Sequence, residues 1–426
     1  MDMDVSSFSL SKENSNQMPS PSPSKQQYQE RLAHQMFDGR NPHEAKILAF
    51  KQKAPAPKEG HLNQFNVLFS AHASSESSKM RAPRHIPSLA ERILDAPNIR
   101  NDFYSNNLDW SRRNVVAIAL QDTESDNDVV YLWDAGSGNI SKLTTSDRVV
   151  CSVKFTEDGN HLSIGKEDGS IEIWDTMTGQ GVRRLVGHEG KVFTLGWNPN
   201  YLISSGDSLG KVRFNDARIQ NSFRAEVQLH NQQVCGMKWN QDGNLLATGG
   251  NDNKVSIYDI NHNRIVHQFT EHNVAVKALA WCPWQKEVLA TGAGSADRHI
   301  RFYNVTNGVL LNSIDTQSQV SSLVWSSDPS CKEIVSGHGY AKNQLCVWKY
   351  PSLVKVAELT GHTERILQMS AGPDNQSVVS VGADETLRFW KIFQSQPKPK
   401  TTSAQGVGMS ALNSTMSKAS SHHLIR

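Results

Sequence analysis

The stretch Leu245–Asp259, LLATGGNDNKVSIYD, is the repeat unit from which the fold of this chain can be predicted. It consists of two short segments of strand character joined by a tight polar turn. Leu246–Gly249 is small and apolar, Gly250–Asn253 supplies turn residues, and Val255–Tyr258 is β-branched and aromatic. This pattern predicts a β-hairpin that ends in an aromatic residue followed by an aspartate.

The same unit recurs along the chain. When the closing aromatic residues are aligned, successive ones lie 40 to 45 residues apart; they are Trp133, Trp174, Phe214, Tyr258, Tyr303, Trp348 and Trp390. A repeat of this length, with four short strands and a Trp-Asp or related ending, is typical of a WD40 propeller blade. We therefore predict an all-β fold, a seven-bladed WD40 β-propeller with disordered N- and C-terminal tails.

Histidine and aspartate residues keep the phase of this repeat. The aspartates stand six residues before a closing aromatic, and the histidines precede the units; they are Asp168, Asp252, Asp297 and Asp384, with His188, His230, His272 and His362. We interpret them as a buried hydrogen-bond relay within each blade. The chain has no metal-ligand spacing, phosphate-binding glycine loop or nucleophile elbow. These patterns predict a recognition protein rather than an enzyme, with no metal and no cofactor.

Composition narrows the class of protein further. The formal net charge of +2 is too small to make nucleic acid or a membrane the main partner. The five cysteines fall singly inside strand patterns, which is typical of free thiols in a reducing compartment. No stretch reaches 18 apolar residues, and the polar start is not a signal peptide. We expect a soluble intracellular protein.

The chain divides into four parts. Residues 1–83 are rich in Ser, Pro, Gln and Lys and are predicted to form a disordered arm with short binding motifs. Residues 84–114 are expected to close the ring by lending a strand to the last blade, lying against the outside of the first and last blades. Residues 115–393 form the blades, with an acidic insertion, Gln121–Asp128, between the first two strands of blade one. Residues 394–426 are predicted to be a disordered tail ending Ile-Arg.

Several segments carry more information than a generic WD40 repeat. They are IPSLAERILDAPNIRNDFYSNNLDW from Ile86, VCGMKWNQDGNLLATGGNDN from Val234, AVKALAWCPWQKEVLATG from Ala275 and GHGYAKNQLCVWKYPSLVKVAELTGHT from Gly337. The chain resembles the Fizzy family, WD40 substrate receptors and activators of the anaphase-promoting complex, over about residues 84–393. The KAPAP string and the NVLFS segment of the arm are more similar to the mitotic branch of the family.

This resemblance implies a function and partners. The family binds degrons of mitotic regulators, such as mitotic cyclins and anaphase inhibitors, so that the complex ubiquitinates them. The implied partners are core subunits of the anaphase-promoting complex, degron-bearing substrates and spindle-checkpoint proteins, with no nucleic acid and no membrane. The implied location is the nucleus and cytoplasm, with the kinetochore or spindle in mitosis.

The family holds a Lys-Glu-Asn (KEN) degron on one face of the propeller with polar side chains. The matching positions here are Asn251, Asn253, Ser295, Gln344 and Arg388. Their chemistry fits this role, because an arginine pairs with the carboxylate of the degron while amides satisfy its asparagine and lysine. By residue type alone, the two asparagines would merely shape a turn; the resemblance favours the binding role.

A second degron, the destruction box, binds between the first and last blades in this family. It places a leucine in an apolar slot and an arginine on acidic groups. Leu120 matches the slot. The insertion after it displaces the family's Leu-Asp register, so we assign the acid to Asp122, with Asp126 and Asp128 as alternatives.

The resemblance also assigns motifs in the tails. The ending Ile425-Arg426 matches the family's ligase-docking tail, and Lys46-Ile47-Leu48 resembles a second docking motif whose usual final arginine is Ala49 here. The segment Val67-Leu68-Phe69-Ser70 resembles the one captured as an extended strand by a spindle-checkpoint protein. Lys12-Glu13-Asn14 is itself a KEN string, which would make the protein a substrate of its own complex or a self-inhibitor.

Two alternatives to a ligase activator stay open from the sequence. The family's C-box, an Asp-Arg-aromatic-Ile-Pro-x-Arg string, is absent, and Arg84-His85-Ile86-Pro87 is only a partial match. A checkpoint scaffold that binds degrons without activating the ligase is therefore one alternative. The other is a receptor for a cullin-type ligase, because Asn215-Asp216-Ala217-Arg218 approximates a W-D-x-R docking motif. The sequence leaves open whether Ser20 and Ser22, each before a proline, are phosphorylated.

Overall fold

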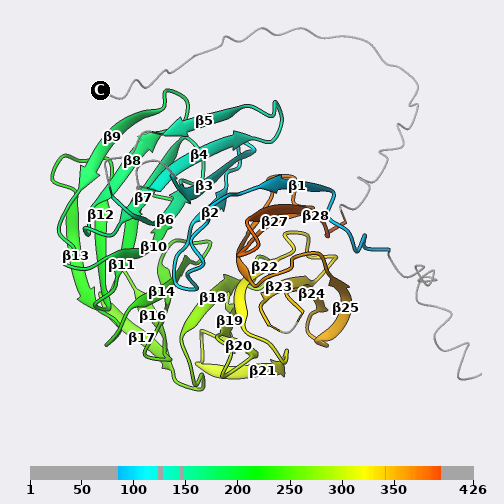
Figure 1. Cartoon of the computed structure of the whole chain (residues 1–426). Helices are drawn as coiled ribbons and strands as arrows, with labels where there is room; N and C mark the ends of the chain where they lie inside the picture. The colour runs from blue at the N-terminus through cyan, green and yellow to red at the C-terminus, as the bar shows by residue number, and fades with distance from the viewer. Residues whose placement is uncertain (1–84, 123–127, 144–147, 341, 395–426) are drawn as a thin grey trace, which may run out of the picture. The chain divides into compact units, whose positions relative to one another are not determined.

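The computed structural model describes residues 85–122, 128–143, 148–340 and 342–394. Within these ranges the regular elements are 28 strands, which form seven four-stranded antiparallel sheets. The sheets follow one another around a ring (Figure 1). The prediction of a seven-bladed β-propeller is confirmed.

Each blade consists of four strands, which follow one another from the centre of the ring outward. Blade one has β2 (Leu108–Trp110), β3 (Val115–Gln121), β4 (Asp128–Asp134) and β5 (Ile140–Leu143); blade two has β6 (Val150–Phe155), β7 (His161–Lys166), β8 (Ile171–Asp175) and β9 (Gln180–Leu185). Blade three has β10 (Val192–Trp197), β11 (Leu202–Asp207), β12 (Lys211–Asp216) and β13 (Phe223–Gln228); blade four has β14 (Val234–Trp239), β15 (Leu245–Gly250), β16 (Val255–Asp259) and β17 (Arg264–Phe269). Blade five has β18 (Val276–Trp281), β19 (Val288–Ala293), β20 (His299–Asn304) and β21 (Val309–Asp315); blade six has β22 (Val320–Trp325), β23 (Glu333–His338), β24 (Leu345–Lys349) and β25 (Val354–Leu359). Blade seven has β26 (Ile366–Ala371), β27 (Ser377–Gly382), β28 (Thr386–Lys391) and β1 (Arg92–Asp95).

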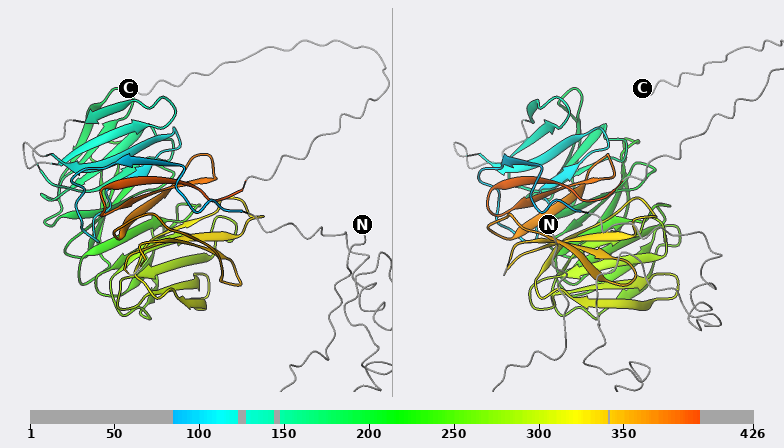
Figure 2. Two further views of the ribbon diagram at one scale, coloured as in Figure 1. Left: turned by 45° about the vertical axis from the view of Figure 1, so that its right-hand side comes forward. Right: turned by 90° about the vertical axis from the view of Figure 1, so that its right-hand side faces the viewer.

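The repeated strand order defines two faces of the propeller. In every blade the first strand packs against the first strands of the neighbouring blades at the centre (Figures 1 and 2). Since all neighbouring strands within a blade are antiparallel, the turn between the second and third strands lies on the same face as the loop that enters the first strand. We call this the upper face. The repeat unit Leu245–Asp259, which forms β15, a turn and β16, places its polar turn on it.

The ring is closed by the start of the described chain. Strand β1 pairs with β28 from Arg92 opposite Phe389 to Asp95 opposite Thr386, so the outermost strand of blade seven precedes blade one in sequence. Leu94 and Ile99 flank the junction and pack with the cluster of blades one and seven that contains Leu387. Closing a propeller in this way ties the two ends of the described chain together by backbone hydrogen bonds and gives the last blade its fourth strand.

Two details of blade one correct the sequence interpretation. The blade begins at β2 rather than at Val115, because β2 has only three residues and its weak signal is masked by the apolar run that follows. The acidic insertion lies between β3 and β4, which are the second and third strands of the blade rather than the first two. It therefore joins two strands whose ends meet at the upper face.

Apolar side chains fill the spaces between neighbouring blades. The cluster between blades five and six contains Phe302, Trp325, Trp348 and Tyr350, and the rings of Trp325 and Tyr350 meet edge to face at 5.2 Å between centroids. The closing aromatic residues used to count the blades all lie on third strands, and Tyr258 and Trp390 are almost fully buried. Burial of these large side chains is the main source of stability for each blade.

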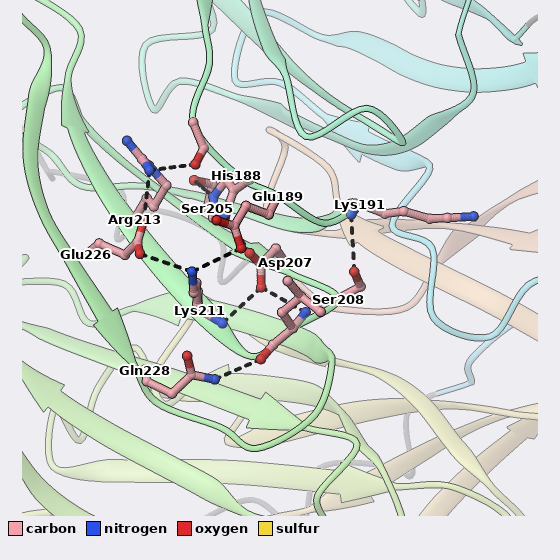
Figure 3. Close-up of polar contacts among 12 residues, drawn as sticks. His188, Glu189, Lys191, Ser205, Asp207, Ser208, Lys211, Arg213, Glu226 and Gln228 are labelled. Atoms are coloured by element: carbon pink, nitrogen blue, oxygen red, sulfur yellow. Dashed lines mark hydrogen bonds and ion pairs between the residues drawn. The ribbon is translucent and has the colours of Figure 1, made fainter.

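The histidine relays form in four blades. In blade three His188 contacts Asp207 at 2.9 Å and Ser205 at 2.7 Å (Figure 3). The equivalent trios of blades four, five and seven have the histidine within 2.7 to 3.0 Å of its partners; they are His230–Asp252–Thr248, His272–Asp297–Thr291 and His362–Asp384–Ser380. The trios connect the loop entering the first strand to the second strand and the turn after it.

The expectation of a relay in every blade is wrong for blades one, two and six, and the described residues of blade one contain no histidine. Asp168 instead accepts hydrogen bonds from Ser170 and Arg184, and blade two buries an ion pair between Lys166 and Glu172 at 2.6 Å. In blade six His338 contacts Ser336 at 2.6 Å and the carbonyl of Gln319, without a carboxylate. The spacing from the closing aromatic residue predicts where an aspartate lies in the blade. It does not predict whether a histidine of the same blade lies within hydrogen-bonding distance of that aspartate.

The relay of blade five gives a stability prediction. Asp297 is buried and also bonds Arg301 at 2.6 Å, whose side chain is 11% exposed, and these partners lower the pKa of the Asp297 carboxyl despite its burial. Asp297→Ala leaves the guanidinium buried without its anion, and we expect a loss of about 3–5 kcal/mol in the free energy of unfolding.

Asp168→Ala is the matched control, because its partner Arg184 is half exposed and the loss should stay within about 1 kcal/mol. Chemical denaturation of both variants checks this. Equal destabilisation would contradict the structural role assigned to the blade-five relay.

The buried histidines also predict how stability depends on pH. Burial lowers the pKa of His272 and His362 and lowers that of His338 to about 4. The unfolded chain therefore binds these protons more readily than the folded one. The free energy of unfolding should have its full value above the ordinary histidine pKa of about 6.5, and it should decrease as the pH drops below that value. Thermal midpoints measured from pH 7.5 to 5 check this, and a midpoint that stays level or rises on acidification would refute it.

Candidate functional site

The fold brings the five predicted KEN-binding residues to one face. Asn251 and Asn253 lie in the β15–β16 turn of blade four, Ser295 in the β19–β20 turn of blade five and Gln344 at the end of the β23–β24 turn of blade six. Arg388 lies on β28 of blade seven, two residues into the strand that follows the last such turn. All five therefore belong to the second-to-third-strand region of consecutive blades, from blade four to blade seven.

Asn251 is held in place by two neighbours. Its amide Nδ2 donates to Gln232 Oε1 at 3.0 Å, and its Oδ1 accepts from the hydroxyl of Tyr104 at 3.2 Å. Asn253 adopts a φ of 65°, a left-handed conformation that asparagine tolerates better than most residues. The structure thus assigns Asn253 a role in shaping the turn. The hydrogen bonds to Gln232 and Tyr104 fix the orientation of the Asn251 amide.

Buried side-chain amides without hydrogen-bond partners gather in blade six. Gln344 is 7% exposed and its Oε1 lacks a partner; the same holds for Oδ1 of Asn343 beside it and for Nε2 of Gln319 on the loop that enters β22. An unpaired buried polar atom costs about 1–3 kcal/mol, so each one calls for a partner such as an ordered water, an ion or a ligand. We call these three side chains the blade-six amide cluster; the other buried side-chain atoms without a partner in the described residues belong to Asn107, Gln233, His267 and Trp284.

Arg388 supplies the positive charge of the predicted site. Its side chain is 14% exposed, its Nε donates to Thr386 Oγ1 at 3.1 Å, and its Nη2 lies 3.8 Å from Asp384. Burial opposes ionisation of Asp384, but hydrogen bonds from His362 and Thr386 lower its pKa to about 2. The contact between Arg388 and Asp384 is long, so part of the guanidinium's hydrogen-bonding capacity remains for an anionic ligand.

The sequence interpretation missed a segment at the centre of this face. The expectation for residues 84–114 is that they lie against the outside of the first and last blades, and β1 does so. Residues 96–107, which we call the crossing segment, instead run across the middle of the ring between β1 and β2 (Figure 1). Asn106 Nδ2 donates to the carbonyls of Phe193 in blade three and Cys235 in blade four. The polar string RNDFYSNN is a usable signal, because it is too long for a hairpin turn.

A buried lysine fastens the crossing segment from the opposite side. Lys277 of β18 donates to the carbonyls of Ser105 and Leu367, both at 2.9 Å, and its ammonium lies 5.5 Å from the centroid of the Phe103 ring. Burial lowers the pKa of Lys277 to about 8. The carbonyl oxygens and the aromatic face partly replace the water that this charge loses.

The predicted destruction-box residues lie at the junction of blades one and seven. Leu120 on β3 is 8% exposed and packs in the cluster that contains Ile99 and Leu387. Asp122 follows β3 and is 3.9 Å from Lys142. Of the two alternatives for the acid, Asp126 is outside the described residues. Asp128 is buried, and its carboxylate is already occupied. Both of its oxygens accept from Arg100, and one also accepts from the amide of Val150. The geometry therefore favours Asp122 over Asp128.

The predicted tail motifs lie outside the described residues. They are Lys12-Glu13-Asn14, Ser20, Ser22, Lys46-Ile47-Leu48, Val67-Leu68-Phe69-Ser70 and Ile425-Arg426. Within the described ranges, no group of three or more histidine, cysteine, aspartate or glutamate side chains is placed to hold a metal ion. The same part of the chain contains no helix long and apolar enough to cross a membrane.

Known proteins are similar to this chain in sequence and in fold. A family model described as the CDC20/Fizzy WD40 domain matches residues 94–390. The anaphase-promoting complex subunit cdc20 of Dictyostelium discoideum is 46% identical over 386 residues, which cover 88% of this chain and 76% of that protein. Cell division cycle 20.1, cofactor of APC complex, of Arabidopsis thaliana is 45% identical over 87% of this chain and 79% of its own length.

A solved structure agrees with these matches. A chain in the crystal structure of the mitotic checkpoint complex superposes on this chain with a TM-score of 0.69 at 41% sequence identity. The superposition covers 74% of this chain and 98% of that one.

The blade-six amide cluster gives a stability prediction that separates a binding residue from a structural one. In Gln344→Leu an unpaired acceptor is replaced by an apolar side chain of similar size, so the thermal midpoint should stay level or rise. Gln368→Leu is the matched control, because the Gln368 amide accepts from Leu108 N and donates to Leu108 O. That variant should lose about 1–3 kcal/mol. A drop for Gln344→Leu as large as that of the control would show that its carbonyl stabilises the fold.

Proposed function

Because this chain belongs to the CDC20/Fizzy family of WD40 proteins, we propose that it is a substrate-recognition and activator subunit of the anaphase-promoting complex. It binds KEN-box and destruction-box degrons of mitotic regulators and presents them for ubiquitination, and it takes part in the spindle checkpoint. Its place of action is the nucleus and cytoplasm, and in mitosis the kinetochore or spindle.

One observation carries the assignment of the KEN site. The blade-six amide cluster belongs to the same series of blades as the other predicted residues, Asn251 of blade four and Arg388 of blade seven. A KEN peptide offers one carboxylate, one carboxamide and one ammonium, which together need both donors and acceptors. The guanidinium of Arg388 suits the carboxylate, and the unpaired amides suit the other two groups.

A rigid platform explains recognition without catalysis. The relatives are named as a subunit and cofactors of the complex, which is an adaptor role. The propeller holds its polar side chains on turns fixed by strand pairing and relays, so that little entropy is lost on the receptor side when a peptide binds. The chain contributes binding energy and position, and the ligase supplies the chemistry.

The comparisons favour this function over the alternatives. Relatives named as cofactors of the complex favour an activator over a non-activating scaffold. For a cullin-type ligase, the docking motif would have to offer Arg218 to a partner. Here Arg218 makes two hydrogen bonds to Asp216, which also accepts from Arg224. The guanidinium of this arginine is therefore paired within its own blade, although its side chain is 59% exposed.

The test is ubiquitination of a cyclin fragment by purified anaphase-promoting complex with the full chain added. We expect activity with the wild type, and a loss in Arg388→Ala and in a chain lacking Ile425-Arg426. For Arg388→Ala, the lost charge-assisted hydrogen bond should weaken KEN-peptide binding about 10- to 100-fold.

The matched control is Arg112→Ala, which removes an exposed arginine paired with Glu157 outside the predicted site. It should behave as the wild type. Peptide binding that depends on Arg388 without ubiquitination would identify the non-activating scaffold instead. Absence of both would refute degron recognition altogether.

A further inference from the structure

The crossing segment touches the predicted destruction-box site at one end. The amide of Gln121, next to Leu120, donates to the carbonyl of Asn98 at 3.2 Å. Ile99 packs in the same cluster as Leu120. Arg100 Nε lies 3.1 and 3.0 Å from the two carboxylate oxygens of Asp128, at the start of the strand that pairs with the Leu120 strand. Three consecutive residues thus support the site.

The same segment touches the predicted KEN site at its other end. The Tyr104 hydroxyl donates to Asn251 Oδ1, a contact between residues 147 positions apart in sequence. Asp102 holds the local turn, because its carboxylate accepts from the Tyr104 amide at 2.9 Å and from the Ser105 hydroxyl at 2.7 Å. Arg365 of blade seven donates to Asn101 through both Nε and Nη2.

The residues between these ends form one short stretch of backbone that is hydrogen-bonded to the blades at several points. Beyond Tyr104 the chain is anchored, since Asn106 exchanges backbone hydrogen bonds with Cys151 and Val153 of blade two. Only residues 98–104 separate the carbonyl at the destruction-box site from the hydroxyl at the KEN site. A segment this short, pinned at both ends and in the middle, has little room to change one end independently of the other.

We propose that residues 98–104 are a shared positioning element of the two degron sites, with Tyr104 and Arg100 as its positioning residues, so that a ligand at one site raises affinity at the other. This inference rests on the proposed function. A ligand that carries both degrons binds more tightly simply because the two degrons are tethered. The proposed coupling is a separate contribution to affinity that arises within the receptor. Thermodynamic linkage requires the effect to be reciprocal and equal in the two directions.

The test uses two separate peptides, so that tethering makes no contribution. A labelled peptide with an Arg-x-x-Leu destruction box is titrated with the full chain by fluorescence anisotropy, with and without a saturating unlabelled Lys-Glu-Asn peptide. We expect the second peptide to tighten the first by about fivefold, and the reverse experiment to give the same factor. A residue that merely supports the fold would change both affinities without changing this factor.

Tyr104→Phe removes only the hydroxyl that reaches Asn251. In this variant the factor should fall to about one, while destruction-box affinity measured alone stays as in the wild type. Arg100→Lys, which keeps the charge but loses the two-oxygen contact with Asp128, should also weaken the link. Tyr201→Phe is the matched control, because its hydroxyl likewise bonds a side chain, Asp158, but lies outside both sites. It should retain the wild-type factor.

Each result decides something. Binding of both peptides to the wild type without coupling overturns this inference and leaves the proposed function intact. Coupling that survives in Tyr104→Phe and Arg100→Lys, with thermal midpoints unchanged, overturns the role of the crossing segment. Failure of either peptide to bind overturns the proposed function and this inference with it.

Discussion

The pairing of β1 with β28 holds the ring closed, and the rest of the molecule relies on it. A ring of sheets joined only by side-chain packing opens at the junction of its first and last blades, where the chain itself makes no connection. Here four residue pairs, from Arg92 opposite Phe389 to Asp95 opposite Thr386, close that junction with backbone hydrogen bonds. Closure has a second consequence. The chain must travel from the outer edge of blade seven to the inner strand of blade one, and it does so over the central channel.

That path places a polar segment where ligands are expected. The crossing segment contacts blades one to five and seven through hydrogen bonds to Ala119, Cys151, Phe193, Asn251 and Lys277, and to Arg365. The turns around it are in turn held by the histidine relays, which fix the loops of four blades from within. The upper face is therefore rigid in its backbone, and the unpaired amides of blade six are held there at a cost in stability. This combination of a stiff scaffold with unsatisfied polar groups is what a receptor for short extended peptides requires.

Burial separates the polar side chains that stabilise a blade from those that can bind a ligand. His272, Asp297 and Arg301 are buried, and their charges and hydrogen bonds stabilise the fold. Loss of one of these side chains leaves the others buried without a partner. Where Arg388 and Asn251 reach the upper face, the same residue types remain open to a ligand. Residue type alone does not separate these roles, since arginine, asparagine and aspartate occur in both. The local surroundings of each side chain decide between structure and recognition.

The number of blades could be predicted from the amino-acid sequence, because it follows from the 40- to 45-residue period of the closing aromatics. The KEN residues could be assigned only through the resemblance to the Fizzy family, since GGNDN by itself indicates no more than a turn. Only the folded ring establishes which aspartate is hydrogen-bonded to each histidine. It alone also shows that Arg100 is hydrogen-bonded to Asp128, and that Tyr104 is hydrogen-bonded to Asn251, 147 positions away in sequence. Strand periodicity records whether a side chain faces the core or solvent, but it carries no information about which distant residue stands opposite. Contacts across the channel exist only once the ring has closed.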